Sequence, residues 1–199
     1  VSHDLRTPLT RMRLQLALMT NNEDTKAISS DISEMEEMID GYLAFAAGEG
    51  DEAPQELAVD ELLNRLVTQA QKSHKFDITL SPVKDEIPAF PMRRNAIQRA
   101  FSNIISNAIR YSTKTIVAIR MRNDEVISTF DDNGAGIPQE RRADAIRPFI
   151  RLEESRNRRT GGAGLGLSIT SDVILSHGGE LTLGDSPLGG LRVAIKLPV

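Results

Sequence analysis

An imidazole with a carboxylate beside it lies near the start of the printed sequence, where His3 is followed by Asp4 and, three positions later, by Thr7. Neutral imidazole, with an ordinary pKa of roughly 6.5, is a competent nucleophile near pH 7, and an adjacent carboxylate can take or orient its ring proton. Leu5 and Leu9 belong to an apolar heptad stripe. The three polar residues fall outside that stripe, so we expect an exposed imidazole. An ordinary surface histidine is the alternative for this segment taken by itself.

Two asparagines, Asn103 and Asn107, stand four positions apart in a segment that predicts a helix over about 93–111. With this spacing both amides project from one helix face, which we place opposite the apolar stripe of the same helix. Two amide oxygens can hold a hydrated Mg²⁺, and Arg110 can reach a phosphate. The alternative is a solvated helix face with ordinary asparagines.

Two glycine-rich turns follow. Asp132 ends an apolar run and precedes Gly134 and Gly136, so backbone can approach a flat ligand closely while the carboxylate accepts a hydrogen bond from an exocyclic amine. The second turn, 160–167, leads glycine amides into a helix N-terminus, which suits the phosphates of a nucleotide. The preceding residues, 141–159, carry seven arginines against three acids and are typical of a basic lid. An ordinary turn and a solvated loop are the alternatives for these segments.

Composition excludes several classes of function. The 199 residues contain 24 Lys+Arg and 28 Asp+Glu, a formal charge of −4, so nothing suggests a basic field that attracts nucleic acid. Cysteine is absent, which excludes thiolate zinc sites and thiol nucleophiles. No apolar run approaches the roughly 18 residues of a membrane span. We therefore expect no nucleic-acid partner.

Residues 1–46 carry two apolar heptad stripes separated by the polar turn 20–24, which predicts an antiparallel helical hairpin. One hairpin cannot cover both of its own stripes, whereas two copies can form a four-helix bundle, so we expect a homodimer through residues 1–46. Residues 47–54 are acidic, contain glycine and end in proline, which predicts a linker. The stripes are Leu5, Leu9, Met12, Leu16 and Met19, then Ile28, Ile32, Met35, Ile39 and Tyr42.

Residues 55–199 mix helices and strands without a regular βαβ period, which predicts an α+β sandwich with helices on one face of a mixed sheet. Asp60 is the expected N-cap of the first helix. The helices are expected near 60–70, 93–111 and 165–176, and the strands at 76–80, 115–122, 125–131, 180–184 and 191–197.

The His, Asn and two glycine motifs occur in one order, and this order resembles the sensor histidine kinases of two-component systems. Residues 1–46 resemble their dimerisation and phosphoacceptor hairpin, and 55–199 their ATP-binding domain of the GHKL or Bergerat type, shared with gyrase and Hsp90. The text around His3, the segment Asn-Ala-Ile-Arg-Tyr at 107–111 and the terminal Leu-Pro-Val are most similar to the osmosensing members. The resemblance covers nearly the whole chain.

The resemblance implies a role for each motif. His3 would be the phosphoacceptor and Asp4 its acid/base partner, and Thr7 would position water for dephosphorylation. Asn107 would be the main Mg²⁺ ligand with Asn103 assisting. The remaining residues implied to contact ATP are Arg110, Tyr111, Asp132, Gly134, Gly136, Ile137, Phe149, Gly162, Gly164, Leu165, Gly166 and Leu167.

The expected reaction is ATP-dependent autophosphorylation of His3, followed by transfer to an aspartate in the receiver domain of a response regulator of the OmpR type. Hydrolysing relatives carry glutamate where Asn103 stands, and an amide cannot be a general base, so a kinase is favoured over an ATPase. We expect this to be the cytoplasmic portion of a protein anchored in the bacterial inner membrane through an upstream region. The alternatives are a phosphatase-biased member relying on Thr7, and a non-catalytic scaffold that docks a regulator.

Overall fold

The computed structural model describes residues 2–19, 22, 25, 28, 29, 32, 35, 52–74, 76–84, 86–148, 150 and 164–199. Helix α1 spans Ser2–Ala17, and residues 25, 28, 29, 32 and 35 have helical backbone. Between them, Asn22 N–H donates to Thr25 Oγ1 and Thr25 N–H donates to Asn22 Oδ1, each at 2.8 Å. Such a reciprocal pair is typical of a helix start, in agreement with the predicted hairpin.

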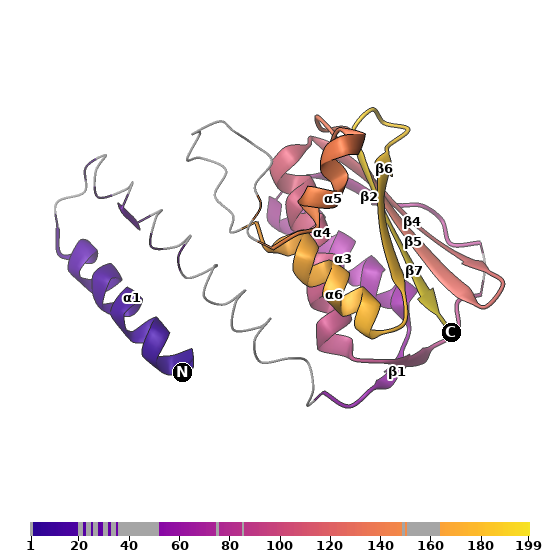
Figure 1. Ribbon diagram of the computed structural model, residues 1–199, viewed down its shortest axis with the longest axis horizontal. Coiled ribbons are helices and arrows are strands. Elements are labelled where there is room, and N and C mark those ends of the chain that lie inside the picture. Colours follow the sequence, from indigo (N-terminus) through magenta and orange to yellow (C-terminus); the bar gives the residue numbers. More distant parts are fainter. Residues whose placement is uncertain are drawn as a thin grey trace.

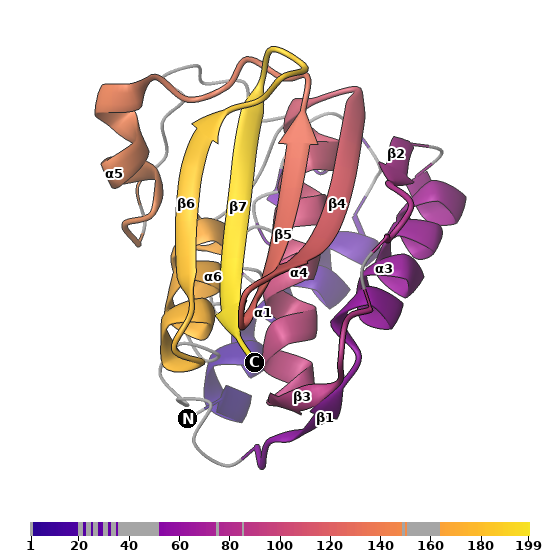
Figure 2. The same ribbon diagram turned by 90° about the vertical axis from the view of Figure 1, so that its right-hand side faces the viewer.

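The larger part of the chain is a two-layer sandwich. A five-stranded sheet has the order β2-β4-β5-β7-β6, with β2 parallel to β4 and the other neighbours antiparallel. Three helices cover one face of this sheet (Figures 1 and 2). The predicted α+β architecture is thereby confirmed. The strands are β2 (Asp77–Leu80), β4 (Lys114–Arg122), β5 (Glu125–Asp132), β6 (Glu180–Asp185) and β7 (Leu191–Pro198), and the helices are α3 (Val59–His74), α4 (Arg94–Tyr111) and α6 (Gly166–Ser176).

Alternation along the strands and a 3.6-residue period along the helices build one core between these layers. On α4 the buried side chains include Ile97, Phe101 and Ile104, as the apolar stripe predicts. Phe101 contacts Phe130 of β5, with ring centroids 5.8 Å apart. These contacts fix α4 on the middle of the sheet, so the polar side chains of α4 are held in fixed positions relative to the strand ends.

Four short elements and one cap differ from the predictions. Strands β1 (Gln55–Leu57) and β3 (Phe90–Met92) pair antiparallel as a separate small sheet, and each is too short for its alternation to be recognised. Residues 139–145, expected to be loop, form the 3-10 turn η2 (Gln139–Arg141) and helix α5 (Arg142–Ala145). Asp60 lies inside the first turn of α3 and not at its N-cap, because the helix begins at Val59 and Leu62 N–H bonds to Ala58 O.

The two ends of the layers carry different elements. Helix α4 begins next to the β1–β3 sheet and ends at the edge where β5 ends and β7 begins (Figure 2). Within the described residues, no helix is long and apolar enough to cross a membrane.

Candidate nucleotide site

A pocket lies between the end of α4, the sheet and the start of α6. Its empty space of about 280 Å³ includes volume that is open to solvent. The lining is mainly apolar with three polar residues. The lining residues are Ile104, Asn107, Ala108, Thr115, Phe130, Asp132, Leu167, Leu191 and Val193.

Asp132 supplies a carboxylate whose position is fixed by the backbone. Its Oδ1 accepts hydrogen bonds from Gly134 N–H at 2.8 Å and from Leu191 N–H at 3.0 Å. Only 9 % of the residue is exposed. Both bonds end on Oδ1, so the geometry suits Oδ2 to accept a hydrogen bond from a ligand amine in the pocket.

Glycines are required where backbone segments crowd around this carboxylate. A Cβ on Gly190 would lie 2.5 Å from Gly134 N and 2.6 Å from Asp132 O, and would also meet Asp132 Oδ1. A Cβ on Gly134 would meet the carbonyl oxygen of Tyr111 at the end of α4. Contacts this short do not occur for real Cβ atoms, so both positions need glycine for steric reasons. Gly136 has a φ of +69°, a conformation that favours glycine.

Asn103 and Asn107 do not form the solvated helix face that was the alternative interpretation of their spacing. Both are half-buried, and Asn103 Nδ2 donates to Gly166 O at 3.3 Å. A Cβ on Gly166 would lie 3.6 Å from Asn107 Nδ2. The amides therefore lie beside the buried stripe of α4 and face α6. The prediction that they lie opposite that stripe is wrong, because a second helix packs on this side of α4.

The N-terminus of α6 lies beside the pocket and follows the undescribed residues 151–163. Leu165 is the N-cap residue and makes no side-chain capping bond, and the first turn contains no acidic residue. The first four N–H groups of a helix lack partners within the helix, and the macrodipole favours an anion there. Gly166 and Leu167 occupy this first turn, and Leu167 lines the pocket. Amide oxygens, a carboxylate and a helix N-terminus therefore meet at one pocket.

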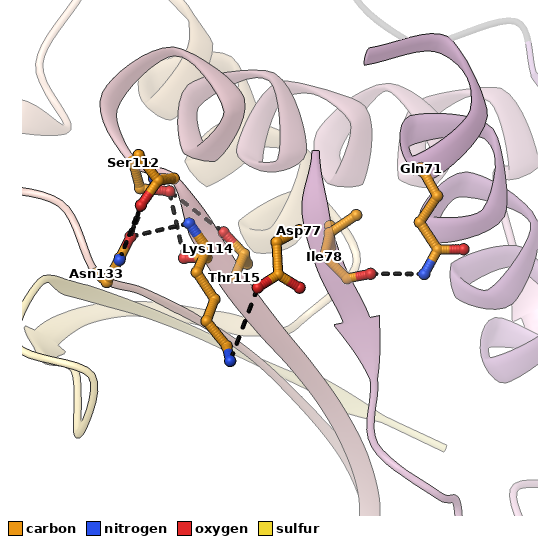
Figure 3. A network of polar contacts seen from close by, with 8 residues as sticks. Gln71, Asp77, Ile78, Ser112, Lys114, Thr115 and Asn133 are labelled. Carbon is orange, nitrogen blue, oxygen red and sulfur yellow. Dashed lines mark hydrogen bonds and ion pairs between the residues drawn. The ribbon is translucent and has the colours of Figure 1, made fainter. Parts of the chain in front are cut away.

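A polar network holds the end of β5 against the end of α4 (Figure 3). Asn133 Oδ1 accepts from the N–H groups of Thr113 and Lys114 at 3.0 and 2.9 Å. Ser112 Oγ donates to Ala108 O at 2.7 Å and closes the last turn of α4. Because Asn133 follows Asp132, these bonds fix the distance between the carboxylate and the asparagine helix.

On the opposite face of the sheet, an ion pair fixes the strand ends. Arg192 Nε and Nη2 donate to the two carboxylate oxygens of Asp131 at 2.7 and 2.8 Å. This hydrogen-bonded contact with Asp131 raises the pKa of Arg192. The pair joins the last residues of β5 to the first residues of β7, where Leu191 bonds to Asp132.

Several predicted site residues lie elsewhere. Arg110 is half-buried and Tyr111 is 45 % exposed, and neither lines the pocket just described. Ile137 contributes its carbonyl, which accepts from Arg142 Nε at 3.0 Å. Gly164 has a φ of +67° just before α6. The side chains of His3 and Asp4, and residues Phe149 and Gly162, lie outside the described residues.

Sequence reasoning missed Thr115, Leu191 and Gly190. Thr115 is fully buried and faces the pocket from the start of β4. Alternation along 115–122 could have placed it on the same face as Val117. No local pattern could have indicated Gly190, since its need for glycine arises from segments 56 or more residues away that meet only in the fold.

The fold and pocket define a nucleotide-binding domain of the ATPase kind. Residues 92–199 match the family described as histidine kinase-, DNA gyrase B-, and HSP90-like ATPase. Residues 1–51 match the His kinase A phospho-acceptor domain. The chain belongs to this ATPase family and, with both domains in this order, has the organisation of a sensor histidine kinase core.

Individual relatives agree with this assignment. The chain is 34 % identical over 210 residues to the sensor histidine kinase CpxA of Escherichia coli K12, covering 100 % of this chain and 46 % of that protein. It is 32 % identical over 207 residues to the sensor protein RstB of the same strain, covering 100 % and 47 %. The chain thus spans about half the length of these relatives.

Solved structures share the fold. The ATP binding domain of PrrB from Mycobacterium tuberculosis matches with a TM-score of 0.59 and 26 % identity, covering 74 % of this chain and 98 % of that one. Full-length ShkA, solved in complex with AMPPNP, matches with a TM-score of 0.72 and 20 % identity, covering 99 % of this chain and 44 % of that one.

Proposed function

We propose that the pocket binds ATP with the adenine amino group on Asp132 and the phosphates toward the start of α6. The observation that carries this proposal is that the fixed Asp132 carboxylate, Asn107 and Leu167 of the α6 N-terminus line the same pocket. ATP combines a planar ring that carries an amine with a polyanionic triphosphate. The amine suits the Asp132 carboxylate, and the triphosphate suits the N-terminus of α6. The apolar side chains that line the rest of the pocket suit the adenine ring.

Mg²⁺ is proposed to bind between the phosphates and the α4 amides. Among the described residues, no group of three or more His, Asp or Glu side chains could form a metal site by itself. Mg²⁺ commonly uses one or two protein ligands together with substrate phosphates, and the donor set of Asn107 with Asn103 fits that pattern. When bound, the ion would neutralise charge on the transferring phosphoryl group. The Asn103 amide cannot activate water as a base, which protects bound ATP from hydrolysis.

The proposed reaction transfers the γ-phosphoryl group of ATP to His3. The imidazole forms an N–P bond as the bond between the β–γ bridging oxygen and the γ-phosphorus breaks, ADP leaves, and Asp4 takes the imidazole proton. A receiver aspartate of a response regulator of the OmpR type then accepts the phosphoryl group and frees the imidazole. Thr7, which is exposed on α1, is proposed to position water when the hairpin dephosphorylates the regulator.

We propose that the hairpin of residues 1–46 is a dimerisation unit. The residues of its two apolar heptad stripes differ in exposure within a single chain. Leu9 and Ile32 are buried, at 2 % and 3 % exposed. Other residues of these stripes remain exposed, as expected of a face that a second copy covers in a four-helix bundle. These are Met12 at 45 %, Met19 at 58 %, Ile28 at 45 % and Met35 at 44 %.

The intact protein is proposed to be anchored in the bacterial inner membrane, with this core on the cytoplasmic side. The support is that the chain spans about half the length of relatives whose names describe them as sensors. The proposed division is a hairpin over 1–46, a linker beginning at 47, and an ATP-binding domain whose first strand is β1 (Gln55–Leu57).

The test is phosphate incorporation by the full chain incubated with γ-³²P-ATP and Mg²⁺, followed by addition of a receiver domain. We expect acid-labile label on the wild type that moves to the receiver. His3→Gln should abolish labelling while its ATP affinity stays within about twofold, because His3 is proposed as acceptor and not as ligand. His74→Gln removes another imidazole and is the matched control. Persistent label on the His3 variant would reject His3 as the acceptor.

A further inference from the structure

Helix α4, which carries both asparagines, begins without a cap of its own. Its N-cap residue Arg93 makes no side-chain capping bond, and the first turn contains no acidic residue. The first-turn N–H groups of a helix need partners from elsewhere. Here the partner comes from a distant part of the chain.

Glu52 supplies that partner. Its Oε1 accepts from Asn95 N–H at 2.8 Å and its Oε2 from Ala96 N–H at 3.3 Å, across 43 and 44 positions of sequence. Both carboxylate oxygens are therefore engaged at the positive end of the helix dipole, where a negative charge is stabilised. Three residues later β1 begins, and its Gln55 pairs with Met92 just before α4. Residues 52–57 are thus fixed along the start of α4.

This contact changes the expected linker. The sequence predicts a linker over 47–54, yet Glu52 already belongs to the ATP-binding domain. The segment that can reorient the two domains therefore ends before residue 52. We propose that Glu52 is a positioning residue. By bonding to the start of α4, the helix that carries Asn103 and Asn107, it fixes the point at which the linker joins the ATP-binding domain, and we call this point the pivot. This inference rests on the proposed phosphotransfer from ATP to the hairpin.

The structure connects this pivot to the site through packed helices. From Asn95 to Asn107 α4 rises by about 18 Å, at roughly 1.5 Å per residue. At its start, Arg93 N–H and Nε donate to His177 Nε2 at 3.2 and 3.4 Å, and Arg93 Nη2 bonds to Ser176 Oγ. His177 is the C-cap of α6. The linker is therefore attached where both helices that line the pocket are joined.

The experiment compares Glu52→Ala with Glu56→Ala in the full chain. Glu56 is an exposed glutamate of β1, so its variant makes the same change in charge and size without touching α4. Glu52→Gln, which keeps one acceptor oxygen, is a milder variant. Three measurements are made: amide hydrogen exchange in the first turn of α4, ATP affinity, and the kcat and KM of autophosphorylation.

We expect Glu52→Ala to speed exchange at the first-turn amides by about five- to thirtyfold, the size of a lost cap. ATP affinity and KM should stay within twofold, since the pocket is at the other end of α4. The kcat should fall about twofold, because the predicted linker would lengthen from 47–51 to 47–54 and effective concentration falls as about the −3/2 power of length. Glu52→Gln should give smaller changes, and Glu56→Ala none.

A readout independent of catalysis measures the positioning directly. The chain has no cysteine, so spin labels can be placed at the exposed residues Leu14 and Leu175, which are 63 % and 61 % exposed. Spin-labelled chains are mixed with excess unlabelled chains, so that only distances within one chain are measured. The distribution of the distance between the two spin labels, from pulsed dipolar spectroscopy, should broaden in Glu52→Ala and not in Glu56→Ala. Faster exchange with an unchanged distribution would reduce Glu52 to a stabilising cap and overturn the proposal, as would unchanged exchange. If wild-type His3 incorporates no ³²P, the proposed function is rejected. Amide exchange and the spin-label distances would still decide the role of Glu52.

Discussion

The N-termini of α4 and α6 face the same electrostatic demand and meet it in opposite ways. At α4 the unpaired amides are satisfied by the carboxylate of Glu52, brought from 43 positions away. At α6 the N-cap residue Leu165 contributes no side-chain bond, and no acidic residue occupies the first turn. The start of α4 is thus capped by a distant carboxylate, whereas at α6 the N-cap residue supplies no cap. The difference teaches that this chain can cap a helix with a distant carboxylate, and it fits the proposal that the start of α6 receives the phosphates of ATP.

The residues around the N-termini of α4 and α6 also differ. Beside the start of α6 are the half-buried amides of Asn103 and Asn107, the first of which donates to Gly166 O. Beside the start of α4 are charged and hydrogen-bonded side chains, with Arg93 bonded to His177. These surroundings fit the proposal that the α6 end binds a ligand, whereas the α4 end is held by contacts within the chain. Variants at the first end should therefore alter ligand affinity far more than variants at the second.

The largest effect is expected from Gly190→Ala. The added Cβ would fall 2.5 Å from Gly134 N and 2.6 Å from Asp132 O, so the turn around the carboxylate must move. We expect ATP affinity to fall by a hundredfold or more and the free energy of unfolding to fall by about 1–3 kcal/mol, as for other overpacked sites. Calorimetric titration and thermal unfolding measure both.

Gly184→Ala is the matched control, since a Cβ there would meet nothing within 4 Å. It should leave ATP affinity unchanged. If Gly190→Ala binds ATP as well as this control does, the crowded turn is not part of the binding site.

The next effect is expected from Asp132→Asn. Asparagine Oδ1 can still accept from Gly134 and Leu191 N–H groups, so the fold should persist. The second oxygen is replaced by an NH₂ donor that cannot bond to an adenine amine. A hydrogen bond to a charged group contributes about 1.5–3 kcal/mol, so ATP should bind roughly ten- to two-hundredfold more weakly.

Asp131→Asn is the control for this variant, because Asp131 bonds to Arg192 on the opposite face of the sheet. Its ATP affinity should change by less than about threefold in a titration under identical conditions. Equal losses in the two variants would indicate a general disturbance of the strand ends and not a direct contact with adenine.

Long periodic elements of this fold were predictable from sequence, and short ones were not. The stripe with Ile97, Phe101 and Ile104 predicts α4 almost to its ends, because one helix face packs on the sheet. Strands β1 and β3 have three residues each and owe their conformation to pairing with one another. Asp60 has the chemistry of a cap, but the helix start is set one residue earlier by the burial of Val59.

The site was predictable where chemistry resides in side-chain type, as for Asn107 and Asp132. It was not predictable where chemistry depends on approach in space. The requirement for glycine at Gly190 and the cap by Glu52 arise between segments distant in sequence. The asparagine face was misplaced for the same reason, since α6 covers a face that periodicity alone describes as solvated.

The smallest effect of the series tests the start of α6 directly, by comparing Gly166→Asp with Gly166→Asn. A Cβ at this position makes ordinary contacts, with Asn107 Nδ2 at 3.6 Å, so both side chains fit at the start of the helix. The aspartate supplies α6 with the negative charge that Glu52 gives α4, and it should raise the free energy of unfolding by about 0.3–1 kcal/mol relative to asparagine. The same charge repels phosphate, so ATP should bind about tenfold more weakly to the aspartate variant, and the difference should shrink at high salt because ions screen charges near the surface. Titrations at low and high ionic strength measure this difference. Equal ATP affinities of the two variants would mean that the phosphates do not lie at this end of α6. The contrast between the N-termini of α4 and α6 would then be unrelated to ATP binding.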